Sequence, residues 1–318
     1  MMEFWAECEH RCLQTEEPSK CERIASALPG DVRRYAVQIV ENTLRGLGAL
    51  PTSFGRAVAV FDAYCERTAS SAGTPLLQRL PSAVEIICSL ICKMDGCQAS
   101  HHQKRILLPE AAVQMSWALR MYGVCQRQED ICEVTEHSVM EVLDWRLGDF
   151  ISAEQYLRAF CTRLGALTLD HVRSSLDWVE TTCGNVVRAM AARATIYELP
   201  PRRLAAGVFV TGLVAAKLLP VRFLGEHGAL GLTLWGDLSL ADACATPPEY
   251  MPVFLWMLTR AVMADVDDLV SMSAAAGRLV GAVQEHENAA PMGRATVPPL
   301  GPPASMNPQP AASEQLSI

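Results

Sequence analysis

The sequence predicts an all-α fold built from two small helical domains in tandem. Apolar residues recur at helical spacing along most of the 318-residue chain, whereas alternating strand patterns bounded by Asn-Gly or Asp-Gly turns are missing. Half of the residues are apolar and only 19% are charged, so the chain can bury a sizeable core. At roughly 150 residues per domain, its length favours two domains.

Five helices are expected in the first half. Val37, Val40 and Leu44 share one face of a helix expected over 31–47. The same spacing predicts four more helices, over 54–69, 80–94, 108–125 and 128–146. Residues 93–108 form the most polar interior stretch, which we interpret as an insertion or a mobile connector.

Six more helices are expected after a domain join at 147–151. Apolar spacing predicts them over 152–164, 168–193, 201–217, 225–232, 249–262 and 266–286. The longest apolar run, residues 205–216, is shorter than the ~20 residues of a membrane span, so it predicts a buried core helix. Seven of the 19 prolines lie within residues 291–318, a composition that predicts a flexible tail.

The charge balance and the motifs exclude several function classes. The chain has 27 basic and 35 acidic residues with no basic block, so a dedicated nucleic-acid binder is not expected. No nucleophile elbow, zinc-protease motif, P-loop or dinucleotide fingerprint occurs, so no enzyme class is indicated. The first twelve residues lack a signal-peptide pattern, so we expect a cytosolic or nuclear protein whose 12 cysteines are free thiols.

One Cys/His-rich run raises the question of a metal site. Its members are Cys88, Cys92, Cys97, His101 and His102. Their spacing is not that of a usual zinc finger, and the first two lie in an apolar helix. Packed hydrophobic cysteines are therefore the better interpretation, and no metal is predicted.

Four charged residues stand out because they lie in otherwise apolar helices. They are Arg33, Asp62, Lys93 and Glu136. A lone charge on a buried helix face costs several kcal/mol unless it is paired. The four are therefore expected to pair with one another or with another chain.

The positions of these four charges resemble the cyclin family, and within it the D-type cyclins and the D-type-like cyclins of some gammaherpesviruses. The cyclin box has an Arg near the start of its first helix and an Asp in the second, and Arg33 and Asp62 match their separation of 29 residues. The family also has a Lys ending the third helix and a Glu nine residues before the aromatic that closes the fifth. Lys93 matches the first, and Glu136 with Trp145 matches the second.

The resemblance continues into the second half and covers roughly residues 25–287. Residues 153–160 (AEQYLRAF) look like the opening of a second cyclin box, and the double proline before the Ala-Ala-Gly helix within 189–214 is similar to D-type cyclins. The resemblance implies tandem cyclin boxes, each a five-helix bundle. The implied parts are an N-terminal segment (1–24), two boxes (25–150 and 151–287) and a tail (288–318).

The resemblance implies a regulatory subunit that binds and activates a cyclin-dependent kinase as a heterodimer. Lys93 and Glu136 would contact the kinase, Met94 and Met140 would supply apolar contacts, and Arg33 with Asp62 would form a structural ion pair. The family acts at the G1/S transition on retinoblastoma-type substrates, in nucleus and cytoplasm. No cofactor, nucleic acid or membrane is implied.

The chain departs from the cyclin pattern at two places, and Lys93, Glu136 and the function each have an alternative interpretation. Where many cyclins dock Arg-x-Leu substrates, the chain has Val32 and Ile39, and the Leu-x-Cys-x-Glu motif is at best degenerate at 13–17. Lys93 could instead complement a helix dipole, and Glu136 could be a solvated first-turn residue. A helical adaptor that keeps the cyclin fold without activating a kinase is the alternative function.

Overall fold

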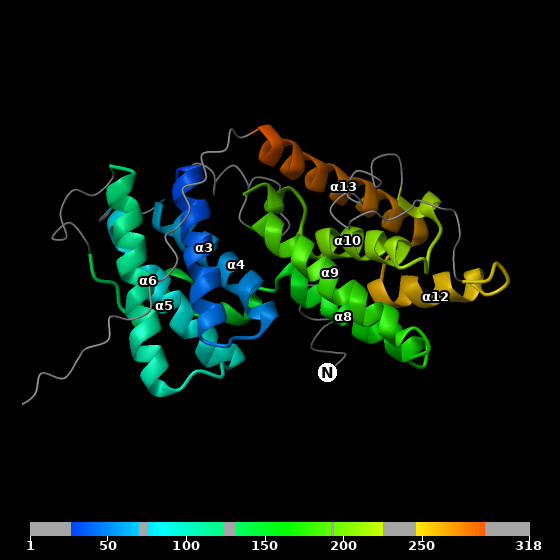
Figure 1. Cartoon of the computed structure of the whole chain (residues 1–318), viewed down its shortest axis with the longest axis horizontal. Helices are drawn as coiled ribbons and strands as arrows, with labels where there is room; N and C mark the ends of the chain where they lie inside the picture. The colour runs from blue at the N-terminus through cyan, green and yellow to red at the C-terminus, as the bar shows by residue number, and fades with distance from the viewer. Residues whose placement is uncertain (1–26, 70–74, 124–131, 192–193, 225–245, 290–318) are drawn as a thin grey trace, which may run out of the picture.

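A computed structural model of the chain describes residues 27–69, 75–123, 132–191, 194–224 and 246–289 (Figure 1). Within these ranges the chain is all-α, with one isolated bridge between Ala49 and Cys97 and no strand, which confirms the predicted fold class. The α-helices are α3 (Gly30–Gly46), α4 (Pro51–Ala69), α5 (Leu76–Asp95), α6 (His101–Met121), α7 (Glu136–Val142), α8 (Ala153–Leu167), α9 (Arg173–Ala191), α10 (Pro201–Ala215), α12 (Met251–Val262) and α13 (Val266–Ala289). Short 3-10 turns cover η2 (Leu147–Asp149), η3 (Ala194–Glu198) and η4 (Val221–Leu224).

In the first half, α5 is the central helix. It packs against α3, α4, α6 and α7, while α3 also lies along α6. The apolar face that the sequence predicts on α3 is buried, since Val37, Val40 and Leu44 are each at most 3% exposed. Hydrophobic burial on this scale is the main source of stability for such a bundle.

In the second half, α10 takes the central place. It packs against α8, α9, α13 and η4. Every residue from Leu204 to Ala215 is buried, which confirms the core helix that the apolar run predicts. Gly207 permits the close contact between α10 and α13, because a Cβ at this position would lie 2.2 Å from the Met272 backbone oxygen of α13. None of the described helices is both long and apolar enough to cross a membrane.

The buried apolar residues form two separate clusters along the chain. One cluster runs from Leu28 to Leu147 with Ala191 added, and the other runs from Ile151 to Val280. The change from one to the other falls within the stretch 147–151. The halves meet where α4 packs against α8 and α9 (Figure 1).

The prediction of a connector over residues 93–108 is wrong, because most of these residues belong to helices α5 and α6. Helix α5 continues to Asp95 and ends at Gly96, whose φ is +81°, and α6 already begins at His101. Ser100 starts α6 through a capping box, in which its hydroxyl accepts from the Gln103 amide and the Gln103 side chain accepts from the Ser100 amide. The true connector is therefore only a few residues long.

Other helix boundaries also differ from the sequence interpretation. Residues 128–131 of the helix expected over 128–146 lie outside the described residues, and the described part forms only the seven-residue α7, which Thr135 and Ser138 cap at its N-terminus. The helix expected over 168–193 begins later, at Arg173, because Leu169 and Asp170 both have positive φ. The N-terminal segment 1–24, the helix expected over 225–232 and the tail over 291–318 lie outside the described residues.

Candidate functional site

The four charged residues separate into two pairs with different surroundings. Arg33 and Asp62 are buried, with 2% and 0% of their side chains exposed, whereas Lys93 and Glu136 are 59% and 47% exposed. Burial is therefore wrong for Lys93 and Glu136, which match the alternative of a lysine at a helix C-terminus and a solvated first-turn glutamate. Both of these residues stand at helix ends, where the side chain can reach solvent.

Arg33 and Asp62 form a bidentate ion pair between α3 and α4. The guanidinium Nε donates to Asp62 Oδ1 at 2.9 Å and Nη2 donates to Oδ2 at 2.8 Å. Nη2 also donates to the Ala191 carbonyl at 3.0 Å, and the Tyr197 hydroxyl donates to Asp62 Oδ2 at 2.5 Å. Because Ala191 ends α9 and Tyr197 lies in η3, this pair connects the first half to the second.

The electrostatics of this pair follow from its burial. Burial disfavours a charged guanidinium, but the Asp62 carboxylate outweighs that effect and raises the pKa of Arg33 above its ordinary value. Burial, with Asp62 adding to it, also raises the pKa of the Tyr197 phenol well above its ordinary value. Tyr197 therefore stays a neutral donor to the carboxylate.

Lys93 and Glu136 form an ion pair on the surface. Lys93 lies in the last turn of α5 and Glu136 is the first residue of α7, and Lys93 Nζ donates to Glu136 Oε2. An exposed pair of this kind contributes only about 0–1 kcal/mol to folding. Its charged groups are therefore available to another molecule at little cost to the fold.

Three apolar side chains close in sequence to Lys93 or Glu136 are exposed or half-buried. Met94 follows Lys93 and is 41% exposed, and Met140 lies one turn beyond Glu136 and is half-buried. Trp145 is 57% exposed, and its backbone N–H donates to the Met140 carbonyl at 2.8 Å. A charged centre with an apolar margin is the composition of a protein-binding surface.

The turn after α7 holds Trp145 in an unusual conformation. Asp144 and Trp145 have φ values of 53° and 60°, which bulky residues rarely adopt. Arg67 of α4 stabilises this turn, because its Nη1 donates to the Val142 carbonyl at 2.9 Å and to the Asp144 carboxylate at 2.8 Å. The His137 ring also contacts the Trp145 ring edge-on, with centroids 5.2 Å apart.

The two positions at which many cyclins dock substrates are not on the surface of this chain. Val32 and Ile39 are 1% and 2% exposed and belong to the core of the first half. Neither side chain can line an open groove in this arrangement.

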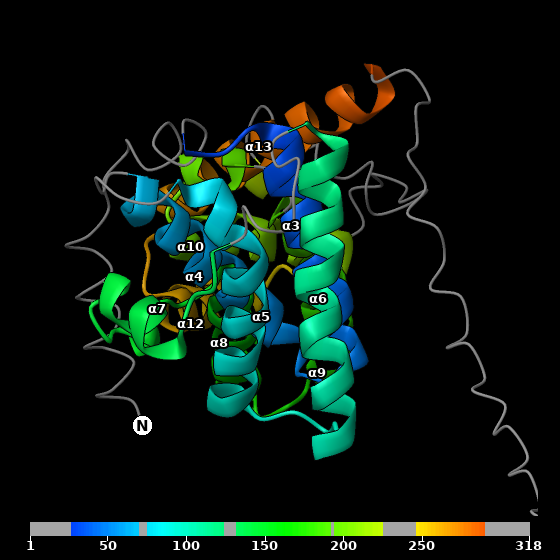
Figure 2. The ribbon, with the colours of Figure 1, turned by 90° about the vertical axis from the view of Figure 1, so that its left-hand side faces the viewer.

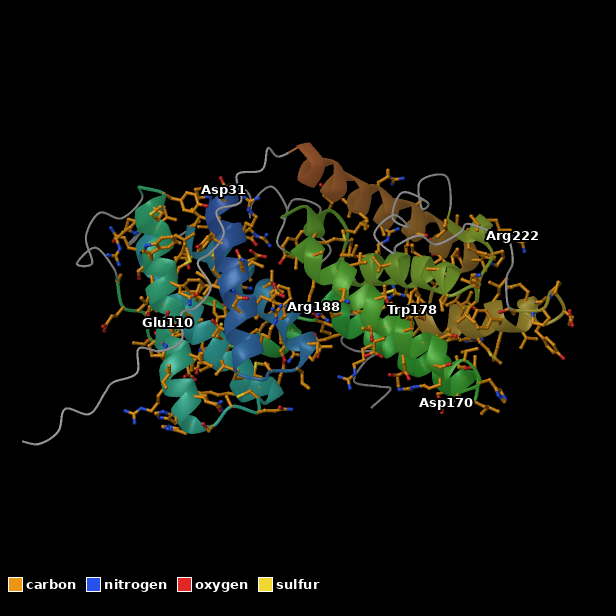
Figure 3. All side chains as sticks on the ribbon, in the orientation of Figure 1. Asp31, Glu110, Asp170, Trp178, Arg188 and Arg222 are labelled. Carbon is orange, nitrogen blue, oxygen red and sulfur yellow. The ribbon has the colours of Figure 1, made fainter. Side chains whose placement is uncertain are left out.

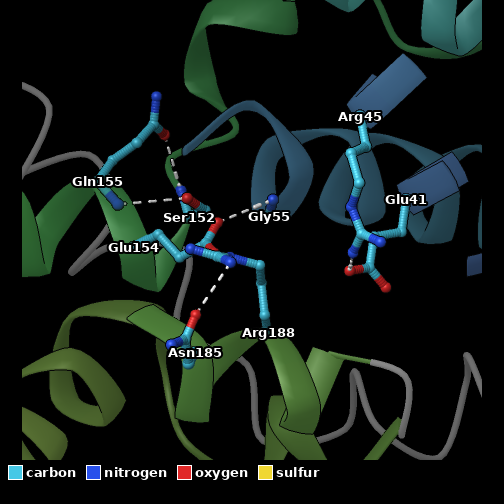
Figure 4. Close-up of polar contacts among 8 residues, drawn as sticks. All are labelled: Glu41, Arg45, Gly55, Ser152, Glu154, Gln155, Asn185 and Arg188. Carbon is cyan, nitrogen blue, oxygen red and sulfur yellow. Dashed lines mark hydrogen bonds and ion pairs between the residues drawn. The ribbon is translucent and has the colours of Figure 1, made fainter. Parts of the chain in front are cut away.

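A third polar site, which the sequence analysis missed, joins the two halves (Figure 4). Glu154 of α8 is 4% exposed and accepts from the Gly55 amide at 3.0 Å and from Arg188 Nε at 2.9 Å. Gly55 is required by this approach, since a Cβ there would lie 2.6 Å from Glu154 Oε2. In sequence, Glu154 looks like an ordinary acidic residue in a first helical turn, so no signal marked it.

Burial controls the protonation of Glu154. It raises the pKa of Glu154 to about 7, although Arg188 and the Gly55 amide favour the charged form. A cavity of about 40 Å³ lies beside the carboxylate, with Val58, Tyr197 and Leu204 among its lining residues. That volume suits ordered water and not a larger ligand.

The Cys/His run does not converge on one point. Cys88 and Cys92 are buried in α5, as the packing interpretation predicts, whereas His101 and His102 are exposed. Burial raises the pKa of the Cys92 thiol to about 12. Among the residues that the structure describes, no three Cys, His, Asp or Glu side chains are grouped to hold a metal ion.

The chain matches no protein-family model and no curated protein sequence. Its functional interpretation therefore depends on the residues themselves and on their arrangement.

Proposed function

We propose that the chain is a two-box cyclin that binds and activates a cyclin-dependent kinase. The observation that carries the proposal is the joint placement of the four charges. Arg33 and Asp62 pair in the core, and Lys93 and Glu136 meet at the surface although 43 residues separate them. This is the division into a structural pair and a partner-facing pair that the cyclin resemblance implies.

The helix arrangement supports the proposal. In the described residues, five helices (α3 to α7) precede the change of core and five (α8, α9, α10, α12 and α13) follow it. In each set the third helix is central. Tandem five-helix bundles with this organisation are what two cyclin boxes would provide.

The proposed mechanism is to hold a helix of the kinase in its active position. Lys93 and Glu136 would hydrogen-bond to main-chain groups beside that helix, while Met94, Met140 and Trp145 exclude water from the contact. The kinase's own Lys–Glu pair and magnesium site could then assemble. Because the chain's ion pair is exposed, it can exchange its internal contact for contacts with the kinase.

Substrate choice would then belong mainly to the kinase. Retinoblastoma-type proteins are the substrates that the D-type resemblance implies, at the G1/S transition and in nucleus and cytoplasm. Since Val32 and Ile39 are buried, we do not assign them a role in docking these substrates.

A charge swap tests the proposed surface. Lys93→Glu combined with Glu136→Lys retains an internal ion pair but reverses the polarity seen by a partner. We expect the swapped chain to fold normally, as judged by urea unfolding, and to lose at least 30-fold in kinase affinity. That loss corresponds to the lower end of the ~2–5 kcal/mol cost of mispairing charges in an interface. Affinity can be measured by interferometry against purified cyclin-dependent kinases.

A matched control separates partner contact from general electrostatics. Arg173 and Asp177 form a comparably exposed ion pair on α9, with Nε and Oδ1 2.9 Å apart. Swapping that pair should leave kinase affinity unchanged. Full binding by the Lys93/Glu136 swap would contradict the assigned surface, and binding without activation would favour the adaptor function.

A further inference from the structure

Helix α6 carries a stripe of exposed apolar side chains on its outer face, with Glu110 between Ile106 and Val113. Ile106, Val113, Trp117 and Met121 repeat at intervals of seven, four and four residues and are 45–67% exposed. Tyr122, just beyond the helix, is also exposed. Single exposed apolar residues are normal, but a stripe of this length marks an interaction surface.

Most of the stripe faces solvent in the described part of the chain, although the Tyr35 ring of α3 contacts Trp117. The inner face of α6 packs on α3 and α5 through residues that include Met115 and Leu119. Figure 2 shows α6 standing at the edge of the first half with its outer face clear of the labelled helices, and Figure 3 shows Glu110 at this edge. Apolar residues on both faces of one helix predict burial on both faces.

The charges around the stripe favour an acidic occupant. Lys104 and Arg105 lie near its N-terminal end and Arg120 lies near its C-terminal end, while Glu110 is the one acidic residue of α6. A second copy in antiparallel contact would bring Arg105 near Arg120 of the other chain, which is unfavourable. An acidic amphipathic segment would satisfy both the apolar centre and the basic ends.

The chain itself contains such a segment. Residues 1–17 carry five glutamates and one arginine. Phe4, Trp5, Cys8 and Cys12 follow helical spacing, which would place them on one face. These residues lie outside the described part of the chain.

The connection between the segment and the stripe is short. The described chain begins at Ala27, just before α3, and α3 runs antiparallel to α6: Tyr35 contacts Trp117 with ring centroids 6.5 Å apart, and Gly46 lies near Leu107. Residues 18–26 can span up to about 30 Å when extended. A tether of this length gives an effective concentration in the millimolar range, far above that of a free partner.

We propose that residues 3–17 dock as an amphipathic segment on the α6 stripe of the same chain. The apolar side chains of the segment would cover Val113 and Trp117, and its glutamates would face Arg105 and Arg120. The proposal is independent of kinase binding.

Limited trypsin digestion of the full chain tests this docking. The rate of cleavage after Arg11, followed by mass spectrometry, should be at least tenfold slower in the wild-type chain than in Val113→Glu, which places a like charge in the stripe. Trp5→Ala should accelerate cleavage similarly from the segment side. Val253→Glu, at a 50% exposed valine on α12, is the matched control and should leave the rate unchanged.

The outcomes separate the possible occupants. Protection that is independent of protein concentration supports docking within one chain. Protection that disappears on dilution would overturn the proposal in favour of a second copy. Equal cleavage rates in the wild-type chain and Val113→Glu, with native circular dichroism in both, would overturn docking altogether.

Discussion

At the residue scale, the structure depends on a few buried charges that connect the two halves. Arg33 makes hydrogen bonds to Asp62 in its own half and to the carbonyl of Ala191 in the other. Glu154 of the second half connects back to the first, since its carboxylate accepts hydrogen bonds from the Gly55 amide of α4 and from Arg188 Nε of α9. Buried ion pairs contribute little net stability when intact but are costly when broken.

Asp62→Asn should therefore destabilise the chain by about 3–5 kcal/mol, because it leaves the Arg33 guanidinium buried without a counter-charge. The midpoint of urea unfolding measures this loss. Asp144→Asn removes an exposed partner of Arg67 and should cost less than about 1 kcal/mol. Similar losses from the two changes would contradict the structural role assigned to the buried pair.

Glu154 should make stability depend on pH. Its pKa rises from about 4.5 to about 7 on folding, so the folded state holds the proton more tightly than the unfolded state. The stabilisation from the protonated form is complete below about pH 4.5 and is lost as pH rises to about 7. Arg188, the Gly55 amide and nearby Glu41 are the groups that act on this carboxylate.

Urea unfolding of the wild-type chain and of Glu154→Gln at pH 5 and at pH 7.5 measures this pH dependence. The wild-type chain should lose more free energy of unfolding over this range than Glu154→Gln, by up to about 3 kcal/mol for a pKa difference of this size. Parallel pH profiles for the two proteins would show that Glu154 does not titrate in this window.

At the element scale, helices α10 and α13 approach each other closely because Gly207 has no side chain. Gly207→Ala would place a methyl group 2.2 Å from the Met272 oxygen and 2.7 Å from the Ala276 Cβ, so the two helices must separate. We expect a loss of about 1–3 kcal/mol, measured by thermal or urea unfolding. Gly30→Ala, which meets nothing within 4 Å at the start of α3, should be neutral or slightly stabilising.

The elements also show what local sequence signals can and cannot predict. Apolar residues at helical spacing predicted α3, and a continuous apolar run predicted α10, in which every residue from Leu204 to Ala215 is buried. The start of α6 was missed, since Ser100 and Gln103 cap a first turn that contains two histidines and a lysine and is followed by Arg105. A prediction based on apolar residues alone interprets a polar first turn as a loop. A capping box can nevertheless begin a helix at such a turn.

At the scale of the whole molecule, the sequence predicted the all-α class and the location of the charges, but not their surroundings. The cyclin resemblance implied a structural Arg33–Asp62 pair and put Lys93 and Glu136 on one partner-facing surface, yet the burial of the first two residues and the exposure of the other two depend on tertiary packing. Glu154 and Gly55 were missed for the same reason. They become neighbours only when the halves meet, and neither residue has an unusual local sequence.

The proposed function gives the two halves different tasks. The first half would present Lys93, Glu136 and Trp145 to a partner, and the second half would support it through Ala191, Tyr197 and Arg188. Weakening the junction should therefore reduce both stability and partner binding, whereas changing the Lys93–Glu136 surface should reduce binding alone.

Kinase activation is the most direct test of the proposed function. Purified cyclin-dependent kinases should be assayed for phosphate transfer to a retinoblastoma fragment, each with and without an excess of the full chain. We expect at least one kinase to gain 100-fold or more in activity, and the Lys93/Glu136 charge swap to abolish the gain. No activation of any kinase, by a chain shown to be folded, would contradict the proposed function.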